Sequence, residues 1–304
     1  MLTFDEYVTA STLDEAFDAL ERIPGARIVA GATDLLPWAR DGRAGDVHLP
    51  ALVDVGRIPE LGGVRWSDDG RIAMGSATPI SAFLRDPLLV IHAPVLGRCA
   101  VWFADNQIRE QATIGGNLVN ASPAGDAMPA LLALNTHVTL ARRDHGQVQE
   151  RVVPLSQFMT GPSHTVCGVN EIVTRLELDA LPDHGVAFEK VGHRRSLVIS
   201  TVCMAAVVKL DRAKRRIDDV RVAIGAVGPV PERLPDVEDL LSGRTVGAQL
   251  LRDVAAGVAD RVRSRTRQAY RREVLVNFVE RGLVAAIAGA GLRLERAPKE
   301  ALHA

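Results

Sequence analysis

The 304-residue chain has few cysteines and few aromatic residues, and charge of neither sign dominates it. Its three cysteines, Cys99, Cys167 and Cys203, are far apart and lack C-x-x-C spacing. This spacing excludes a disulfide framework and an iron–sulfur or zinc motif on this chain alone. The formal net charge of -1 gives no field that would attract nucleic acid or an anionic membrane, so we expect neither as a partner.

Long apolar runs are also missing. No run approaches the roughly 18 apolar residues of a membrane-spanning helix, and residues 1–11 lack the basic start and apolar core of a signal peptide. We therefore expect a cytoplasmic protein with no membrane span. A hydrophobic content of 47% and a charged content of 24% are typical of a globular protein, and the chain is long enough for two domains.

Several common catalytic and nucleotide-binding motifs do not occur in the sequence. They are G-x-G-x-x-G after a strand, G-x-x-x-x-G-K-[ST], H-E-x-x-H and G-x-S-x-G. Their absence disfavours a Rossmann dehydrogenase, a P-loop NTPase, a zincin and an α/β-hydrolase. The eight histidines are scattered singly, so no metal site can be assembled from the sequence. If the chain takes part in catalysis, we expect a bound cofactor to supply the chemistry.

Two glycine-containing turns are the motifs that the sequence does contain. Residues 28–37, IVAGATDLLP, read as a strand, a Gly-Ala turn and a capped helix start. Residues 113–126, TIGGNLVNASPAGD, place two adjacent glycines in an expected loop between helices. Glycine lets main-chain N–H groups approach a ligand, and the N–H groups of a first helical turn attract anions, so both are candidate phosphate sites. Either segment alone is also consistent with an ordinary tight connection.

The remaining pattern predicts mixed strands and helices, then a second α+β unit after a turn-rich boundary at 181–185. Thr12 and Glu15 form a capping box at the start of the first helix. Six arginines within residues 261–272 predict a solvated face or a subunit contact. We expect strands at 4–8, 26–30, 51–55, 172–178, 186–191, 202–210 and 220–227, hairpins at 64–74 and 134–153, and helices from 13, 35 and 78 and at 95–103, 127–134, 246–263 and 266–287.

Taken together, the two turns resemble the paired FAD-binding signature of the flavoprotein subunit of molybdenum hydroxylases, the xanthine dehydrogenase and carbon monoxide dehydrogenase family. The resemblance covers nearly the whole chain, because residues 188–195 and 265–272 resemble the C-terminal domain of that family. It implies an α+β fold with a FAD-binding domain of the vanillyl-alcohol-oxidase or PCMH type, followed by a smaller domain of antiparallel sheet plus helices.

The resemblance also implies a division of the chain into domains. The FAD-binding domain would cover residues 1–180, with two subdomains split near 57–62. The smaller domain, of the carbon monoxide dehydrogenase flavoprotein type, would cover 185–290 and leave a tail at 291–304.

Carried over position by position, the resemblance implies that the first turn wraps the FAD pyrophosphate with main-chain N–H groups and that the second forms the other half of the cradle. Two departures from the family pattern stand out. Ala32 stands where many relatives have glycine, so a methyl group must fit against the phosphates. No histidine lies in either turn, so FAD should be held noncovalently. The implied residues are Arg27, Ile28, Val29, Ala30, Gly31, Ala32, Thr33 and Asp34, then Thr113, Ile114, Gly115, Gly116 and Asn117.

Four further residues match family positions near the cofactor. Asp126 matches an acidic position that would bond a ribose or ribityl hydroxyl, and Phe103 matches an aromatic beside the isoalloxazine. Val173 and Lys190 match positions that line the flavin, where the charge of Lys190 would help tune its potential. A core aromatic and a surface lysine are the alternative interpretations of Phe103 and Lys190.

The function implied is that of an electron-transfer subunit in a heterotrimer. Substrate would be oxidised at the molybdopterin of a large subunit, and electrons would pass through [2Fe–2S] clusters of an iron–sulfur small subunit to FAD, then to NAD⁺, O₂ or another acceptor. The alternatives are a self-contained PCMH-type flavin oxidoreductase and a flavin-free binding or scaffold module. Because the substrate pocket lies on another polypeptide in that family, this sequence leaves purines, N-heterocycles, aldehydes and carbon monoxide open as substrates.

Overall fold

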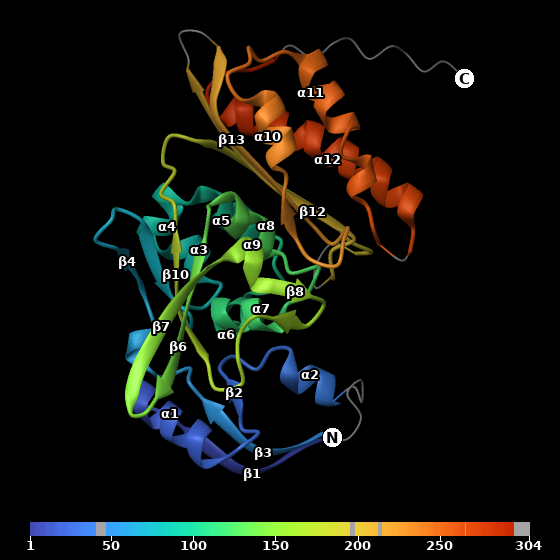
Figure 1. The fold of residues 1–304 in the computed structure, drawn as a ribbon. Coiled ribbons are helices and arrows are strands. Elements are labelled where there is room, and N and C mark those ends of the chain that lie inside the picture. The colour runs from blue at the N-terminus through green and yellow to red at the C-terminus, as the bar shows by residue number, and fades with distance from the viewer. Residues whose placement is uncertain (41–46, 195–197, 212–214, 265, 295–304) are drawn as a thin grey trace.

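The computed structural model describes residues 1–40, 47–194, 198–211, 215–264 and 266–294 (Figure 1). Three main sheets follow one another from the N-terminus to the C-terminus of the chain. Most of the expected tail, and Arg195 and Arg265 of the expected C-terminal motifs, lie outside the described residues. No helix in the described ranges has the length and apolarity needed to cross a bilayer.

The first sheet is small and parallel. Strand β3 (Val47–Asp54) lies between β1 (Leu2–Thr9) and β2 (Arg27–Val29), and helix α1 (Leu13–Arg22) connects the two outer strands. The predicted cap of α1 is confirmed, because the Thr12 hydroxyl accepts the N–H of Glu15 at 3.2 Å. The apolar face of the helix enters a core below the sheet, which contains Ala16, Phe17, Leu20, Val53, Ile58 and Leu61.

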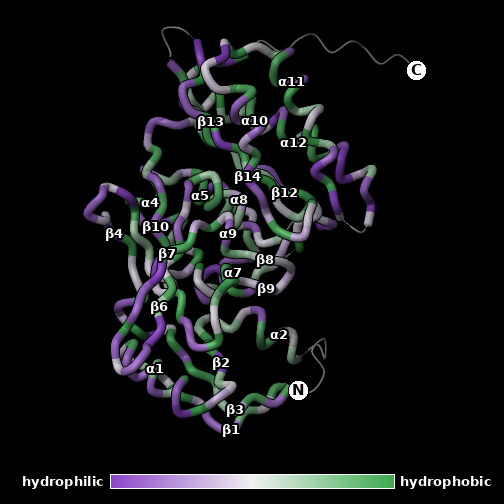
Figure 2. Tube along the Cα trace, in the orientation of Figure 1, coloured by the Kyte–Doolittle hydropathy of each residue, from purple (hydrophilic) through white to green (hydrophobic). Residues whose placement is uncertain are grey.

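The second sheet is antiparallel and has the order β4-β5-β10-β6-β7. In Figure 2 hydrophilic colours follow the β6–β7 hairpin, which lies at the edge of the sheet. The predicted hairpins are confirmed here. The strands are β4 (Val64–Trp66), β5 (Ile72–Gly75), β6 (His137–Asp144), β7 (Gln147–Pro154) and β10 (Ile172–Leu178), and the small hairpin β8 (Met159–Gly161) and β9 (His164–Thr165) lies beside them.

Short helices connect and cover this second sheet, and three of them differ from the sequence prediction. The helix expected from Thr78 begins at Ala82, because Pro79 instead forms a β-bridge with Thr113. The helix expected at 95–103 ends at Ala100. The segment expected as a Gly-Gly loop is helical. Helix α2 (Leu35–Arg40) instead connects β2 and β3 of the first sheet. The helices around the second sheet are η1 (Pro59–Leu61), α3 (Ala82–Arg85), α4 (Pro87–His92), α5 (Pro94–Ala100), α6 (Asn106–Gln111), α7 (Ile114–Asn120), α8 (Ala127–Ala133) and α9 (Leu155–Phe158).

The third sheet is antiparallel, with the order β11-β12-β13-β14, and helices cover its outer face (Figure 1). The three predicted strands are confirmed, but the helix expected at 246–263 ends at Ala256 and a short 3-10 turn follows. The elements are β11 (Gly185–Val191), β12 (Val202–Asp211), β13 (Arg216–Gly225), β14 (Glu232–Arg233), α10 (Pro235–Leu241), α11 (Ala248–Ala256), η2 (Ala259–Arg261) and α12 (Gln268–Gly289).

Strand β12 joins the two halves of the molecule. Its side chains alternate between two cores: Cys203 and Ala205 pack with α5 and α8, whereas Met204 and Ala206 pack with α12. A strand that is buried on both faces must be apolar along its length, which explains the continuous run VCMAAVV. We propose that the boundary near 181–185 separates two lobes that share this strand as common core.

Gly185 tests the packing of the third sheet against α12. A Cβ at this position would lie 1.9 Å from the carbonyl oxygen of Ala286 and 2.2 Å from the nitrogen of Ala290. We expect Gly185→Ala to lower the free energy of unfolding by about 3 kcal/mol, because backbone must shift to admit the methyl group. Gly257→Ala is the control, since a Cβ there meets nothing closer than 3.5 Å. Urea unfolding measures both, and equal stability of the two variants would contradict this packing.

Asp219 carries a pH-dependent part of the stability. The hydrogen bond with His184 Nε2 (3.1 Å) and the charge of Arg221 lower the pKa of this carboxyl from 3.8 to about 2. A lowered native pKa means that the ionised form stabilises the fold above pH 3.8 and that this stabilisation disappears as the pH falls toward 2. We expect the stability difference between wild type and Asp219→Asn to shrink over that interval in urea unfolding. A difference that stays constant with pH would contradict the assignment.

Candidate functional site

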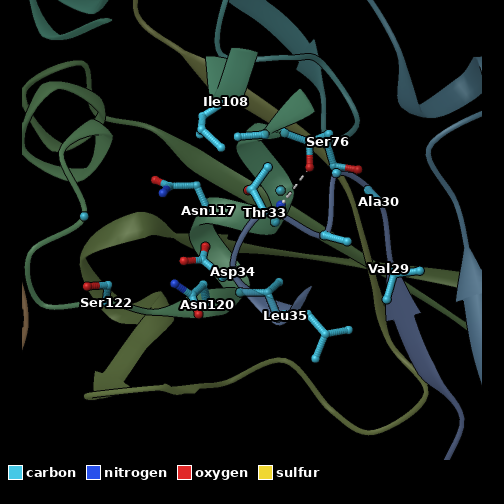
Figure 3. Close-up of a pocket in the computed structure, with 18 of the residues that line it drawn as sticks. Val29, Ala30, Thr33, Asp34, Leu35, Ser76, Ile108, Asn117, Asn120 and Ser122 are labelled. Carbon is cyan, nitrogen blue, oxygen red and sulfur yellow. Dashed lines mark hydrogen bonds between the residues drawn. The ribbon is translucent and has the colours of Figure 1, made fainter. Parts of the chain in front are cut away.

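A cavity of about 660 Å³ lies where the first turn, helix α7 and the segment before β12 meet. Figure 3 shows side chains of the first turn and of α7, among them Asp34, Asn117 and Asn120, around one space. Its volume is within the roughly 300–1,000 Å³ of small-molecule and cofactor sites. The walls combine apolar side chains such as Val29, Ile108 and Ile199 with hydroxyl, amide and main-chain polar groups. Such a lining suits a long ligand with both an aromatic and an anionic part.

The first turn has the predicted form of strand, turn and helix. Strand β2 ends at Val29 and helix α2 begins at Leu35. Gly31 is required for packing, because a Cβ there would lie 1.9 Å from the carbonyl oxygen of Gln111 at the end of α6. Ala32 has φ 52°, in the left-handed region that favours glycine. The methyl group at this position is therefore accommodated in a conformation better suited to glycine.

The same turn offers hydrogen-bond donors to the cavity. In the part of the chain that the structure describes, the N–H groups of Thr33 and Asp34 donate to no protein acceptor. They belong to the start of α2, where the N–H groups of a first helical turn have no partner inside the helix. Burial raises the pKa of the Asp34 carboxyl, since the walls of the cavity partly remove it from water. Main-chain donors without a lysine are a chemical basis for holding a phosphate.

The second turn differs from the prediction, because its glycines lie in helix α7 and not in a loop. Thr113 caps this helix and accepts the N–H of Gly116 at 3.2 Å. The burial of Ile114 and Leu118 outweighs the low helix propensity of the glycines.

The first N–H groups of α7 are already used within the protein. The N–H of Ile114 donates to Thr78 O at 3.0 Å, and that of Gly115 to Ser76 O at 2.8 Å (Figure 3). Asn117 N donates to Thr113 O at 3.0 Å. Helix α7 therefore offers the cavity few free N–H groups. It offers the side chains of residues such as Asn117, and the open backbone surface at Gly116, where no side chain stands.

The two glycines of α7 have different roles. A Cβ on Gly115 would lie 2.7 Å from Ser76 Cβ, so this glycine permits the helix to pack against the end of β5. A Cβ on Gly116 would contact only Thr113 Oγ1, at 3.0 Å, because Gly116 faces the cavity.

Asn117 provides a direct indication of a missing polar partner. Asn117 lines the cavity, and its side-chain oxygen is buried and has no hydrogen-bond partner within the described chain. Figure 3 shows this side chain directed toward the same space as Thr33 and Asp34. Buried polar atoms are rarely left unpaired in proteins, so a ligand that donates to this position accounts for it. The residues present therefore fit a phosphate-containing cofactor.

Asp126 and Lys190 form a buried ion pair beside the cavity. Lys190 Nζ donates to Asp126 Oδ2 and, at 3.0 Å, to the carbonyl oxygen of Trp102. Ser200 Oγ donates to Asp126 Oδ1 at 2.6 Å. The Lys190 side chain is 3% exposed. Burial raises the pKa of Asp126, and the lysine and serine contacts oppose this by stabilising the carboxylate.

All of the residues predicted from the sequence line the cavity except Ile114 and Lys190. Ile114 points into the core, because it follows the helix cap on the side away from the cavity. The ammonium of Lys190 is held by Asp126 and its side chain is buried, so the alternative interpretation of a surface lysine is wrong, and the interpretation as a flavin-lining residue stays a prediction. Contact between FAD and any of these residues stays a prediction.

The sequence prediction omits several residues of the cavity wall. Six of them lie within the two predicted motifs, which were the signal for them: Leu35 in the first, and Val119, Asn120, Ser122, Ala124 and Gly125 in the second. The others come from segments without a motif and reach the cavity only through the tertiary fold. They are Val55, Ser76, Ala77, Ala104, Ile108, Ala112, Cys167, Glu171, Ile172, Arg194, Val198 and Ile199.

The only thiol among the cavity-lining residues is not a nucleophile at neutral pH. Burial raises the pKa of Cys167 to about 11, and the charge of Glu171 adds to the effect. Glu171 itself is held by a bidentate ion pair with Arg151, at 2.7 and 2.6 Å, which lowers its pKa. In the ranges described, no group of three or more His, Cys, Asp or Glu residues is arranged to hold a metal ion.

Comparison with known proteins agrees with this description. Residues 2–180 match the family model of the FAD-binding domain in molybdopterin dehydrogenase, and residues 187–286 match that of the CO dehydrogenase flavoprotein C-terminal domain. The xanthine dehydrogenase FAD-binding subunit of Escherichia coli O157:H7 is 29% identical over 301 residues, which cover 97% of this chain and 100% of that protein. The nicotine 6-hydroxylase medium subunit of Paenarthrobacter nicotinovorans is 30% identical over 239 residues, 78% of this chain and 80% of that protein.

A solved structure supports the same assignment. A chain of the carbon monoxide dehydrogenase of Hydrogenophaga pseudoflava superposes with a TM-score of 0.85 at 25% identity, covering 93% of this chain and 97% of that one. The predicted α+β fold, an FAD-binding domain followed by a smaller C-terminal domain, is confirmed. Because both parts of the chain match and the matched region contains both turns of the cavity, the chain belongs to the family of FAD-binding medium subunits of molybdenum hydroxylases, which are oxidoreductases.

Proposed function

We propose that this chain holds FAD noncovalently in the cavity and serves as the electron-transfer subunit of a heterotrimeric molybdenum hydroxylase. The observation that carries the proposal is the pairing, in one cavity, of unused main-chain donors at Thr33 and Asp34 with the unpaired buried side chain of Asn117. Family membership identifies the ligand class that these groups would bind. The two turns contain no histidine that would form a covalent link to the flavin.

Different residues of the cavity would bind different parts of FAD. The N–H groups of Thr33 and Asp34 would hold the pyrophosphate, and Gly116 would leave room for it beside α7. Asp126 already accepts one hydrogen bond on each carboxylate oxygen, and each oxygen retains capacity for a ribityl or ribose hydroxyl. Phe103 and Val173 would lie against the isoalloxazine, where an aromatic contact is favourable.

Bound FAD would supply the two-electron redox chemistry that no side chain provides. The part of this chain is to bind the cofactor, orient it and shield it between two lobes. We propose that the partners are an iron–sulfur small subunit with [2Fe–2S] clusters and a molybdopterin-binding large subunit, as expected for medium subunits in general. The acceptor would be NAD⁺, O₂ or another oxidant, and the substrate would bind on the large subunit.

Purification with the neighbouring subunits tests this role. We expect a yellow complex with one FAD per copy of this chain, together with molybdenum and iron on the other subunits. The isolated chain, loaded with FAD, should show at most diaphorase activity with artificial acceptors, because the site that oxidises the substrate is elsewhere. Turnover of a small substrate by the isolated chain would instead indicate a self-contained flavin oxidoreductase. A chain that stays colourless after incubation with FAD would indicate a scaffold module.

Gly31→Ala tests the first turn as part of the FAD site. The added methyl group would collide with the carbonyl oxygen of Gln111 and push the turn away from α6. Since tenfold in affinity corresponds to about 1.4 kcal/mol, we expect the displacement to weaken FAD binding by at least about tenfold. Gly161→Ala is the control, because a Cβ there meets only His164 Cβ at 4.0 Å. Titration of apoprotein with FAD, followed by flavin fluorescence, measures both, and equal affinities would exclude the first turn from the site.

A further inference from the structure

Two cations from different parts of the chain hold three consecutive carbonyl groups of the cavity wall. Lys190 Nζ donates to Trp102 O at 3.0 Å. Arg109 Nη1 donates to Phe103 O at 2.5 Å and to Ala104 O at 3.4 Å. Phe103 and Ala104 line the cavity, and Phe103 is its only aromatic side chain among the described residues. We call residues 102–104 the wall segment. It contains Phe103, the one aromatic residue among the described residues that line the cavity.

Lys190 and Arg109 provide the hydrogen bonds to the carbonyl groups of the wall segment within the described residues. It follows the end of α5 at Ala100 and precedes α6, and Ala104 has φ 42°, a left-handed conformation that alanine rarely adopts. Trp102 is 46% exposed, so its ring packs only partly on the protein. The carbonyl groups point toward the two cations, whose charge strengthens each hydrogen bond.

Lys190 is itself fixed from the other lobe. It lies on β11, and its ammonium is held by Asp126 at the start of α8, which in turn accepts from Ser200 before β12. Its side chain is 3% exposed, so the ammonium group is almost completely removed from water. Lys190 is absent from the cavity lining, whereas its partner Asp126 is part of it.

Arg109 provides the second anchor from the N-terminal lobe. It lies on α6, and its guanidinium also donates to Asn106 Oδ1, so its planar group is held in one orientation. Its recorded partners are two carbonyl groups and one amide, so its removal leaves no buried carboxylate without a cation. Arg109 and Lys190 approach the wall segment from separate elements.

We propose that Lys190 and Arg109 are positioning residues that together hold Phe103 against the FAD site, so that a residue of the C-terminal lobe helps to place a wall of the site through the main chain of Trp102. The identity of the ligand rests on the proposed function, whereas the placement of the wall segment does not.

A double-mutant cycle with Phe103 tests the proposal. Arg109→Met and Lys190→Met should each weaken FAD binding by about tenfold, the effect of losing one aromatic stack. In a Phe103→Ala background, Arg109→Met should change the affinity less than about twofold, because the ring it positions is already gone. Lys190→Met should keep only the part of its loss that comes from Asp126, whose carboxylate has lost its cation. Losses that are equally large in both backgrounds would overturn the proposal and indicate that the cations act on the cofactor independently. Arg98→Met is the matched control, since Arg98 is exposed on the neighbouring helix α5.

A second readout needs no FAD. In a Trp38→Phe/Trp66→Phe background, Trp102 is the remaining tryptophan of the chain, and iodide quenching of its fluorescence reports its accessibility. Arg109→Met and Lys190→Met should raise the quenching constant about twofold, whereas Arg98→Met should leave it unchanged. Unchanged quenching in both positioning variants would overturn the proposal. If quenching rises but the parent chain binds no FAD, the wall anchor stands and the proposed function fails.

Lys190→Met leaves Asp126 buried without its cation and is expected to lower stability. Lys190→Met/Asp126→Asn removes both charges and keeps the quenching test available if the single variant does not fold. Arg109→Met stays informative in either case, because it removes no partner of a buried carboxylate.

Discussion

The structure depends on the burial of one strand on both faces. Alternate residues of β12 belong to the core beneath the cavity and to the core beneath α12, so neither lobe completes its interior alone. The small residues at these positions, such as Ala205 and Ala206, permit close approach from both sides. Burial of apolar area at roughly 25 cal/mol per Å² makes such a shared strand a strong connection between lobes.

A buried ion pair, Lys190 with Asp126, connects the two lobes beside that shared core. Lys190 and Asp126 lose most of their hydration, a cost that is offset only when geometry and further hydrogen bonds are good. Here Ser200 and the Trp102 carbonyl complete the set. A buried ion pair of this kind is weak evidence for stability but good evidence for a defined position. Through Lys190, the pair connects β11 with the start of α8 and with the Trp102 carbonyl of the cavity wall.

Close backbone approach is the second constraint on the site. Gly31 against Gln111 and Gly115 against Ser76 are contacts that no side chain would permit. The first contact brings the turn after β2 against the end of α6, and the second brings α7 against the end of β5. The cavity lies between the turn and these helices. The glycine-containing motifs therefore matter as much for packing the two halves of the site together as for exposing main-chain donors. Only Gly116 has the open side expected of a glycine that faces a ligand.

The sequence by itself determined which segments form the site and the family to which the chain belongs. Local patterns sufficed for the strand–turn–helix at 28–37, for the cap at Thr12 and for the apolar run of β12, because each depends on neighbours within a few residues. Only the tertiary structure decided that Gly115 and Gly116 lie in a helix, and that Lys190 pairs with a carboxylate 64 residues away. Such outcomes depend on burial and on partners distant in the chain, which local propensity does not encode.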